Sequence, residues 1–371
     1  MGLQDHQLTR CIEERVHEVP APMPDLAVVR QRGRAYRRRR TAGVVAAVGM
    51  TAAAGGGALA LGLSADSTAP APTDPQPISG LDYSEGLRAF ASPDEGGEVS
   101  LGGRVLTRED LGEVDTEGTA TQFGLLYYDS DQQVHLLQED GTDVTLAPAP
   151  SSVPDAFRGT SKADSQLPVV AFTQPGEGQV SVLLHAFEAG RTLHTRDVPC
   201  DGQACSEVVV DAVDGGLVFV GTQEGTYVWD PAARGDAGWT LLGKGEFRVA
   251  DARNGRILWS GAPPAPGTDS PVKDWAFTEG AIDSQLSFDG GHVLAWSPKL
   301  EPTTPAGSPI RLDVEGAIFF TFDTDGSVLA ARQGKGQTSV FYDCELPSGA
   351  CTEIGSLSST SGDPIFIGND M

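Results

Sequence analysis

The chain of 371 residues has few aromatic side chains, few cysteines and none of the common catalytic motifs. Aromatic residues make up 7% of it against 46 glycines, which favours a turn-rich chain over a helical one. The motifs HExxH, GxSxG, GxxxxGK(S/T) and GxGxxG are absent. We therefore predict no catalytic residue, no cofactor-binding residue and no metal site. The six histidines show no metal-ligand spacing: His6, His17, His135, His185, His194 and His292.

Cysteine occurs five times, at Cys11, Cys200, Cys205, Cys344 and Cys351. The second and third, and the fourth and fifth, enclose four and six residues around Gly-containing turns. Each pair predicts a disulfide across a hairpin, which is typical of an oxidising compartment. A zinc site would need a tighter Cys-x-x-Cys or a nearby histidine. Cys11 is left as a single thiol.

Basic residues are few and unevenly placed. Residues 1–40 hold nine arginines and five acids, a net charge of +4, whereas the remainder holds 17 basic and 46 acidic side chains, a net of −29. Such a polyanion repels nucleic acid and anionic lipid over a Debye length of about 8–10 Å. We therefore predict that the large part of the chain does not bind nucleic acid.

One long uncharged run, Thr41–Leu63, is present. Its 23 residues would extend about 34 Å as a helix, enough for a hydrocarbon core of about 30 Å. Seven arginines between Arg30 and Arg40 precede it, and Asp66 is the first charge after it. The positive-inside rule then places residues 1–40 in the cytoplasm and everything after Leu63 outside. The prediction is a single-pass membrane anchor.

Two alternatives to the anchor remain open. A cleaved signal is one, of the twin-arginine type because Arg39-Arg40 precedes a weakly hydrophobic, Gly-rich segment. Proline follows each small-residue triplet that could be cut, at Pro70 and Pro72, which disfavours signal peptidase. A buried soluble helix is the other. Ser64–Pro77 is a Pro/Ala-rich linker, so the predicted parts are 1–40, 41–63, 64–77 and a domain at 78–371.

That domain repeats a short apolar strand, a tight turn and a second apolar strand. Asp-Gly and Asn-Gly accept the positive φ of two-residue hairpins, and apolar runs of five to eight residues are strands. A spacing near 40 residues with about four strands per unit predicts a β-propeller, an all-β fold, with seven blades, or six or eight. The seven copies are Leu87–Leu101, Gly124–Leu137, Val169–Leu184, Val208–Gly221, Phe247–Gly261, Ser284–Ser297 and Phe319–Arg332.

One complete unit of four strands is visible within Val208–Gly243. The final segment Asp363–Asp370 reads as one more first strand, which would complete the first blade and close the ring, so that no sheet edge stays open. A two-sheet sandwich is the rival fold. The period resembles that of the WD-repeat and related bacterial propellers, and Trp229-Asp230 matches their Trp-Asp signature once.

Other features have a structural and a functional interpretation. Asp323-Thr324-Asp325-Gly326 matches the start of a calcium loop but lacks the distal Glu, which favours a plain hairpin turn. Tryptophan at strand positions favours the blade core over a ligand face; the five are Trp229, Trp239, Trp259, Trp275 and Trp296.

The segment VPAPMPDLAVVRQRGRAYRRRR, at residues 19–40, precedes an Ala-rich span. It resembles the N-terminus of actinobacterial single-pass membrane proteins that accompany extracytoplasmic-function sigma factors. The zinc-binding HxxxCxxC of the best-known anti-sigma family is missing. The resemblance implies a cytoplasmic regulator as partner of residues 1–40; without it, the arginines are a flank that orients the span.

The sequence predicts a non-enzymatic, membrane-anchored extracytoplasmic binding or scaffold module, whose ligand is an unknown protein or glycan. Rigid repeats and two long inserts, Ala147–Gln166 and Gly261–Asp274, supply variable loops for binding. A transmembrane sensor of the anti-sigma kind is the first alternative. An envelope enzyme with a site in the propeller channel is the second, since residues distant in sequence can converge there.

Overall fold

The computed structural model describes residues 86–91, 98–107, 118–129, 131–150, 152–153, 157, 159–187, 189–233, 235–281, 283–295, 297–334, 338–358 and 365–366. The chain divides into two units, Met1–Gln76 and Pro77–Met371, and the described residues all belong to the second. Among them there is no helix long and apolar enough to cross a membrane. The predictions for residues 1–40, 41–63 and 64–77 lie outside this part, as does Cys11.

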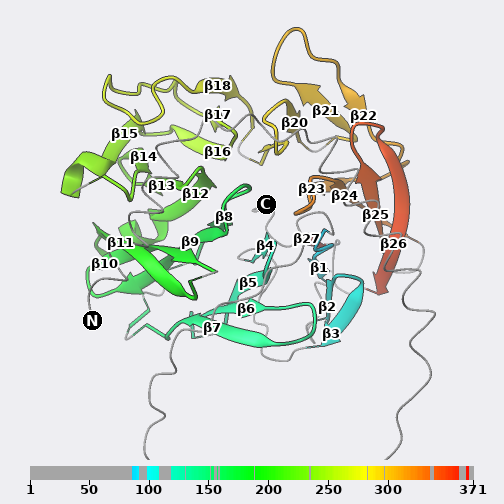
Figure 1. Ribbon diagram of the computed structural model, residues 1–371, viewed down its shortest axis with the longest axis horizontal. Helices are drawn as coiled ribbons and strands as arrows, with labels where there is room; N and C mark the ends of the chain where they lie inside the picture. The colour runs from blue at the N-terminus through cyan, green and yellow to red at the C-terminus, as the bar shows by residue number, and fades with distance from the viewer. Residues whose placement is uncertain are drawn as a thin grey trace, which may run out of the picture. The chain divides into compact units, whose positions relative to one another are not determined.

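Seven sheets stand in a ring in the described part of the chain (Figure 1). We number them as blades in chain order. The fold is therefore an all-β, seven-bladed propeller, as the repeat predicted, and the sandwich alternative is wrong.

The first four blades have four strands each. Blade 1 contains β1 (Phe90–Ala91), β2 (Glu98–Leu101), β3 (Arg104–Thr107) and β27 (Ile365–Phe366). Blade 2 contains β4 (Thr119–Thr121), β5 (Gly124–Tyr128), β6 (Val134–Leu137) and β7 (Asp143–Ala147). Blade 3 contains β8 (Ser161–Ala163), β9 (Val169–Gly176), β10 (Gln179–Ala186) and β11 (Arg191–Pro199). Blade 4 contains β12 (Val209–Asp214), β13 (Leu217–Thr222), β14 (Gly225–Trp229) and β15 (Trp239–Lys244).

The last three blades complete the ring. Blade 5 contains β16 (Arg248–Arg253), β17 (Arg256–Ser260) and β18 (Ala276–Glu279). Blade 6 contains β19 (Gln285–Leu286), β20 (His292–Leu294), β21 (Lys299–Pro302) and β22 (Ile310–Arg311). Blade 7 contains β23 (Phe319–Phe322), β24 (Val328–Gln333), β25 (Thr338–Glu345) and β26 (Ala350–Ser358). Two short 3₁₀ helices, η2 (Gly202–Glu207) and η3 (Gly235–Gly238), lie in connections.

The two ends of the propeller chain close the ring. β27 takes the first-strand place of blade 1 and pairs antiparallel with β1, with Phe366 opposite Phe90. Phe366 is fully buried, and its ring centroid lies 5.8 Å from that of Phe341 in blade 7. Phe341 in turn stacks on Phe90 at 3.8 Å. The predicted role of Asp363–Asp370 as the closing first strand is confirmed.

Each repeated segment forms two neighbouring strands of one blade, but the phase of the repeat changes along the chain. From Val208 onward, the segments are the first and second strands, such as β12 with β13. In blades 1 to 3 they are the second and third strands, such as β5 with β6. The first strands there are three residues long in blades 2 and 3, Thr119–Thr121 and Ser161–Ala163, and too polar to stand out in the sequence.

Blade 5 departs from the four-strand unit, because three strands are found among its described residues and β18 runs parallel to β17. The insert Gly261–Asp274 lies between them and contains four prolines. Proline has no N–H for a sheet ladder, so this insert cannot replace the missing antiparallel strand. It crosses instead to blade 4, where the Ala265 N–H donates to the Leu242 carbonyl at 2.7 Å. The other insert, Ala147–Gln166, contains β8 and is only partly loop.

Hydrophobic clusters lie between blades. Of the clusters that the described residues form, six join blades 1 to 2, 2 to 3, 3 to 4, 4 to 5, 6 to 7 and 7 to 1. None of these six joins blade 5 to blade 6. Trp229 is buried in the cluster between blades 3 and 4, and three more tryptophans pack against clusters: Trp239, Trp259 and Trp275. The core interpretation of these four is confirmed, and Trp296 lies outside the described residues.

Both predicted disulfides are present. Cys344 and Cys351 are register partners on β25 and β26, so this bridge does span a hairpin. Cys200 and Cys205 are also joined, but not across a hairpin. Cys200 follows β11 and Cys205 lies in η2, so this bridge sits on the connection from blade 3 to blade 4, where Cys205 joins the hydrophobic cluster between them.

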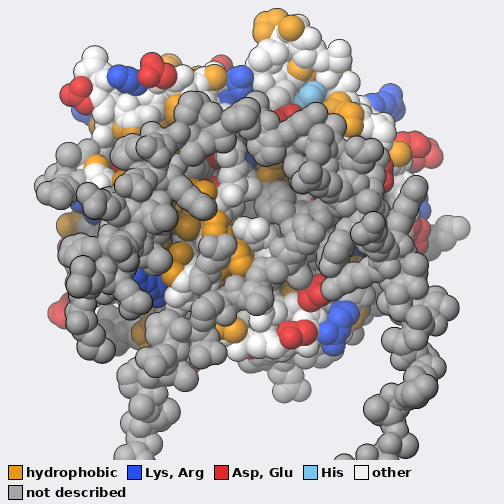
Figure 2. Space-filling view, in the orientation of Figure 1, with side chains coloured by type: hydrophobic (Ala, Val, Ile, Leu, Met, Phe, Trp, Pro, Cys, Tyr) orange, Lys and Arg blue, Asp and Glu red, His pale blue; other side chains and the backbone are white. Residues whose placement is uncertain are grey.

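The outer surface offers little apolar area in its described part. Large hydrophobic side chains are exposed singly, at Val105, Val153 and Ile318. On the face drawn in Figure 2, the visible acidic and basic side chains lie around the rim, with both signs near one another. An apolar docking surface on this part of the chain is therefore a weaker candidate for a functional site than the centre of the ring.

We expect Phe366→Ala to weaken the closure of the ring. Removing a fully buried phenylalanine typically lowers the free energy of unfolding by about 3–5 kcal/mol. Urea unfolding followed by fluorescence measures it. Ile318→Ala, at an exposed side chain, is the matched control and should change the value by at most about 0.5 kcal/mol. Equal stability of the two variants would mean that β27 does not close the ring.

Candidate functional site

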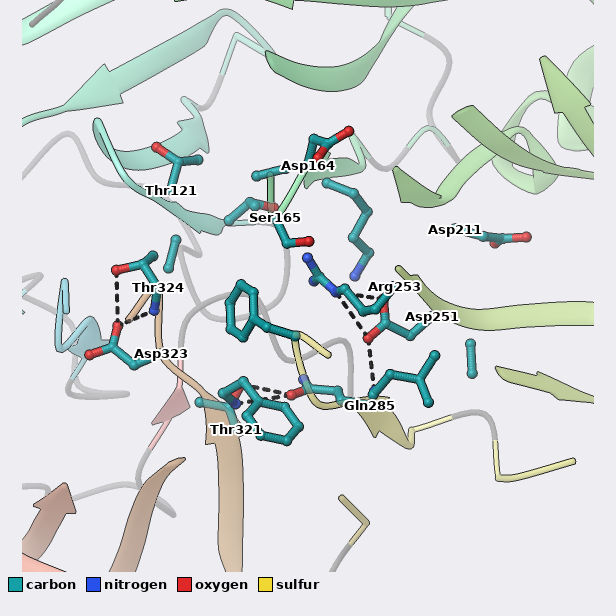
Figure 3. A pocket seen from close by; sticks show the side chains of 18 of the residues that line it. Thr121, Asp164, Ser165, Asp211, Asp251, Arg253, Gln285, Thr321, Asp323 and Thr324 are labelled. Atoms are coloured by element: carbon teal, nitrogen blue, oxygen red, sulfur yellow. Dashed lines mark hydrogen bonds and ion pairs between the residues drawn. The ribbon is translucent and has the colours of Figure 1, made fainter. Parts of the chain in front are cut away.

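A cavity of about 120 Å³ lies at the centre of the ring (Figure 3). The first strands and adjoining turns of blades 2 to 7 line it. One water needs about 10–15 Å³ of such volume, so there is room for several waters or one small organic molecule. Its charged lining side chains are Lys162, Asp164, Asp211, Asp251, Arg253, Asp283 and Asp323.

Carboxylates hold neighbouring blades together both in the lining, as Asp164 does, and outside it, as Asp214 does. Asp164 of blade 3 accepts a hydrogen bond from the Gly216 N–H of blade 4 at 2.9 Å. Asp214 of blade 4 accepts an equivalent hydrogen bond from the Gly255 N–H of blade 5 at 3.0 Å. Both glycines end two-residue hairpin turns and have positive φ, +77° and +72°, which a residue with a side chain rarely adopts. The turn and the junction between blades thus depend on the same residue.

The same arrangement recurs at other junctions. Asp251 of blade 5 accepts from the Leu286 N–H of blade 6 at 2.9 Å, and Gln285 of blade 6 accepts from the Phe322 N–H of blade 7 at 3.1 Å. Asp323 of blade 7 accepts from the Leu87 and Arg88 N–H groups of blade 1, at 2.9 and 3.0 Å. In each case a side chain at or near the first strand bonds the backbone of the following blade.

Burial changes the acidity of these groups. It raises the pKa of Asp214 to about 6, and a repulsive contribution from Asp164 acts in the same direction. Burial likewise raises the pKa of Asp164, against three backbone N–H donors that lower it. At Asp323, burial and the nearby Asp325 raise the pKa to about 7. These carboxylic acids therefore keep a proton more readily than exposed ones.

Arg253 breaks the pattern. It occupies in blade 5 the place of Asp214 in blade 4, since each is the last residue of its first strand, paired with Arg256 and Leu217 respectively. The bond to the next blade comes instead from Asp251, two residues earlier. The Arg253 Nε lies 3.2 Å from the Asp251 Oδ1, and its guanidinium carbon lies 5.2 Å from the centroid of the Phe288 ring of blade 6.

Ser165 is the second unusual lining residue. It follows Asp164 in the turn after β8, is 6% exposed, and its hydroxyl has no hydrogen-bond partner among the described residues. Its side chain and that of Arg253 both point into the cavity in Figure 3. Buried hydroxyls in proteins are normally bonded, and an unpaired one costs about 1–3 kcal/mol. A ligand or a water in the cavity would satisfy it.

The histidines do not gather at the cavity. His135 lies between Asp129 and Asp143 on the outer part of blade 2, at 3.3 and 3.2 Å. His185 is buried near Phe187, and burial lowers its pKa to about 4. His194 and His292 lie on β11 and β20, whereas His6 and His17 are outside the described residues.

No group of three metal-ligating side chains occurs within the described residues. Asp323 to Gly326 form the β23–β24 turn, in which the Asp323 carboxylate accepts backbone N–H groups and Asp325 accepts the Ser327 N–H at 2.9 Å. The hairpin interpretation of this segment is confirmed.

The cavity residues Lys162, Ser165 and Arg253 were not singled out from the sequence. Arg253 comes from blade 5, whereas Lys162 and Ser165 come from blade 3 and lie in and just after a first strand too short to recognise. One signal was present for Arg253: aligning VVDAVDGG with VADARNG places it opposite Asp214, an exchange of charge sign at a repeated position.

Comparison with known proteins yields no family. No protein-family model matches the chain, and no curated protein matches it. Among solved structures, TolB from Acinetobacter baumannii is 12% identical with a TM-score of 0.35, covering 70% of this chain and 61% of that one. PorZ of the type-IX secretion system of Porphyromonas gingivalis is 10% identical with a TM-score of 0.38, covering 75% and 37%. A study of two prolyl endopeptidases contains a chain 13% identical, with a TM-score of 0.42, covering 73% and 50%.

This chain thus spans less than two thirds of the length of each of these three proteins. The description of this chain as a propeller rests on its own strand pairing.

Asp214→Asn should change how stability depends on pH. The folded-state pKa of Asp214 is raised from 3.8 to about 6, so between these values the unfolded chain releases a proton that the folded chain retains. The free energy of unfolding of the native protein therefore falls across this window, by about 3 kcal/mol for a shift of about two units. The asparagine does not titrate, and its amide oxygen can still accept the Gly255 N–H.

Urea titrations at pH values from 4 to 8 test this effect. The variant should gain stability relative to the native protein as the pH rises, and the gain should level off above pH 6. Ser356→Ala, at an exposed side chain that does not titrate, serves as the control, with a difference that does not change with pH. A difference between Asp214→Asn and native protein that is constant over the whole range would contradict the prediction.

Proposed function

We propose that the chain is a non-enzymatic binding module of the cell envelope, which takes a small ligand into the central cavity of its propeller. The observation that carries the proposal is the composition of the cavity lining. Blades 3 and 5 place Lys162 and Arg253 there, beside a buried hydroxyl, Ser165, that lacks a partner among the described residues. A few polar groups that converge in a concave site are typical of ligand recognition.

Binding is favoured over catalysis by what the cavity carboxylates do. A general acid or base needs a proton partner on the reacting molecule within hydrogen-bond reach. Asp164, Asp251 and Asp323 direct their oxygens to backbone N–H groups of their own turn or of the next blade. Moving such a carboxylate toward a substrate would break a junction of the ring. These groups are better suited to hold the cavity in shape than to transfer protons.

We further propose that the propeller lies outside the cytoplasm, anchored by Thr41–Leu63 with residues 1–40 inside. Two disulfides in the propeller support an oxidising surrounding. The arginine flank before the uncharged run supports the orientation. In this arrangement a cytoplasmic regulator would bind residues 1–40, as the resemblance to proteins that accompany sigma factors implies. Ligand binding in the cavity would be the signal that the chain passes to this regulator.

Filling the cavity tests the binding function. A thermal-shift screen of small polar compounds, anionic, neutral and cationic, compares native protein with Ser165→Leu. Because a ligand at 100 times its Kd stabilises the folded state by about 2.7 kcal/mol, a hit should raise the Tm of the native protein clearly. Ser165→Leu should remove the shift, because its larger side chain occupies the cavity.

Ser356→Leu, at an exposed position of the edge strand β26, is the matched control and should respond as the native protein does. Hits that stabilise Ser165→Leu to the same degree would place the ligand elsewhere. Chemical conversion of a hit during long incubation would argue for an enzyme.

Thiol labelling tests the topology. In intact cells a membrane-impermeant maleimide should not label the protein, because Cys11 is inside and the other four cysteines are paired. After mild denaturation and reduction of the outer domain, the same reagent should modify four cysteines, and Cys11 only after permeabilisation. Sequencing of the mature N-terminus is the second readout. A start between residues 66 and 72 would show a cleaved signal instead of an anchor.

A further inference from the structure

The central cavity brings together two of the few basic side chains of the propeller. Residues 41–371 carry 17 basic against 46 acidic side chains, yet two of the basic ones, Lys162 and Arg253, line the central cavity. The ratio of acids to bases in the lining, five to two, is close to that of the chain. Carboxylates are present, but those of Asp164, Asp251 and Asp323 accept backbone N–H groups at blade junctions.

The other two lining carboxylates, Asp211 and Asp283, differ in position from the three that join blades. Asp211 bonds the Thr226 hydroxyl within its own blade, at 3.2 Å, and points away from the centre in Figure 3. Asp283 belongs to the loop between β18 and β19, not to a first strand. Burial also raises the pKa of Asp323 to about 7, which reduces its negative charge near neutral pH, and burial raises the pKa of Asp164 as well. The acidic lining is therefore weaker than its count of residues implies.

Arg253 is not required by the architecture. The equivalent place in blade 4 holds an aspartate that joins blades, and in blade 5 Asp251 performs that joining. A departure from a repeated structural rule, with the structural role moved to another residue, is typical of a functional position. Arginine is the side chain suited to a planar anion, because its guanidinium presents five N–H donors in a fork that matches a carboxylate.

The junction of blades 5 and 6 fits this role. It is the junction without one of the six hydrophobic clusters of the described residues, and Arg253 spans it by lying over the Phe288 ring at 5.2 Å. The contact with Asp251 goes through Nε, which leaves the guanidinium oriented by a carboxylate on one side and a ring on its face. An arginine held in this way loses little further freedom when a ligand binds.

We infer that the central cavity binds a small organic anion, whose carboxylate is held by Arg253 and Lys162 and accepts a hydrogen bond from the Ser165 hydroxyl. This inference rests on the proposed binding function and names its ligand class. The anion bridges blade 3, which supplies Lys162 and Ser165, and blade 5, which supplies Arg253. It satisfies the buried hydroxyl and adds a contact next to the junction that has the least hydrophobic support.

Two pairs of matched probes test the charge class independently of size. Succinate is compared with succinamide, which has nearly the same shape and no charge, and glucuronate with glucose. Isothermal titration at low salt measures each Kd for the full-length protein in detergent. At least one anion should bind at least about tenfold more tightly than its neutral partner, since hydrogen bonds to a charged group contribute about 1.5–3 kcal/mol. Added salt should weaken that binding.

Variants then assign the binding to the cavity. Arg253→Gln should weaken the anion by at least about tenfold, and Arg253→Lys should recover part of the loss because it restores the charge but not the fork. Ser165→Ala should weaken it by about tenfold without loss of folding, because the hydroxyl bonds no described residue. Arg311→Gln, at an exposed side chain of β22, is the control and should bind as the native protein does.

Three results would overturn the inference. If the neutral partners bind as tightly as the anions, the ligand class is wrong, while the binding function stands. If the anions bind but Ser165→Ala and both Arg253 variants bind equally well, the site is wrong. If neither anion binds, the inference fails, and the screen with Ser165→Leu shows separately whether the binding function fails with it.

Discussion

Closure of the ring is the constraint on which the rest of this structure depends. A blade of three or four short strands buries its faces only against its neighbours, so an open ring would leave two sheets with one bare face each. Here the closing strand has two residues, and its fully buried Phe366 pairs in register with Phe90 of the first blade and meets the ring of Phe341 of the last blade edge-on. The hydrogen bonds of Asp323 to Leu87 and Arg88 reinforce the same junction from the centre.

Polar side chains near the first strands link the blades at six of the junctions, in the same direction around the ring. They reach from one blade to the backbone of the following blade, from Thr119 of blade 2 through to Asp323 of blade 7. Hydrophobic contacts are tolerant of small shifts, whereas a hydrogen bond to a single N–H is not, so these bonds determine how neighbouring blades are offset. Three of these carboxylates are buried in doing so, and burial raises the pKa of Asp164, Asp214 and Asp323. The cavity is therefore lined by acids whose oxygens are already in use.

The fold could be predicted because it follows from local rules. Asp-Gly and Asn-Gly between apolar runs mark hairpins, and Asp363–Asp370 was recognisable as an extra first strand. The sequence did not show which strands of blades 2 and 3 the repeat covers, since the first strands Thr119–Thr121 and Ser161–Ala163 have no apolar alternation. Blade 5 lost its regular third strand to a proline-rich insert, an effect of missing N–H groups that a spacing argument cannot detect.

The candidate site could not be predicted in the same way. Ser165 has an ordinary residue type in an ordinary turn, and only the packed ring shows that its hydroxyl is buried without a bond to the described residues. Arg253 was detectable in principle, as an arginine at a position where the preceding unit has Asp214. The Cys200–Cys205 bridge shows the same limit, because its spacing indicates a short loop but not that the loop connects two blades.

The acidity of the chain bears on which anion the cavity could hold. Residues 41–371 carry a net charge of −29, and a surface of that sign opposes the approach of an anion within about a Debye length. The opposition grows with the charge of the ligand, whereas the attraction of Lys162 and Arg253 acts at short range in a site that solvent screens less. A ligand with several negative charges gains little from a second carboxylate, because only one pair of cations lines the described cavity. The balance favours an anion of low charge, because a single carboxylate can contact both cations and still accept a hydrogen bond from the Ser165 hydroxyl.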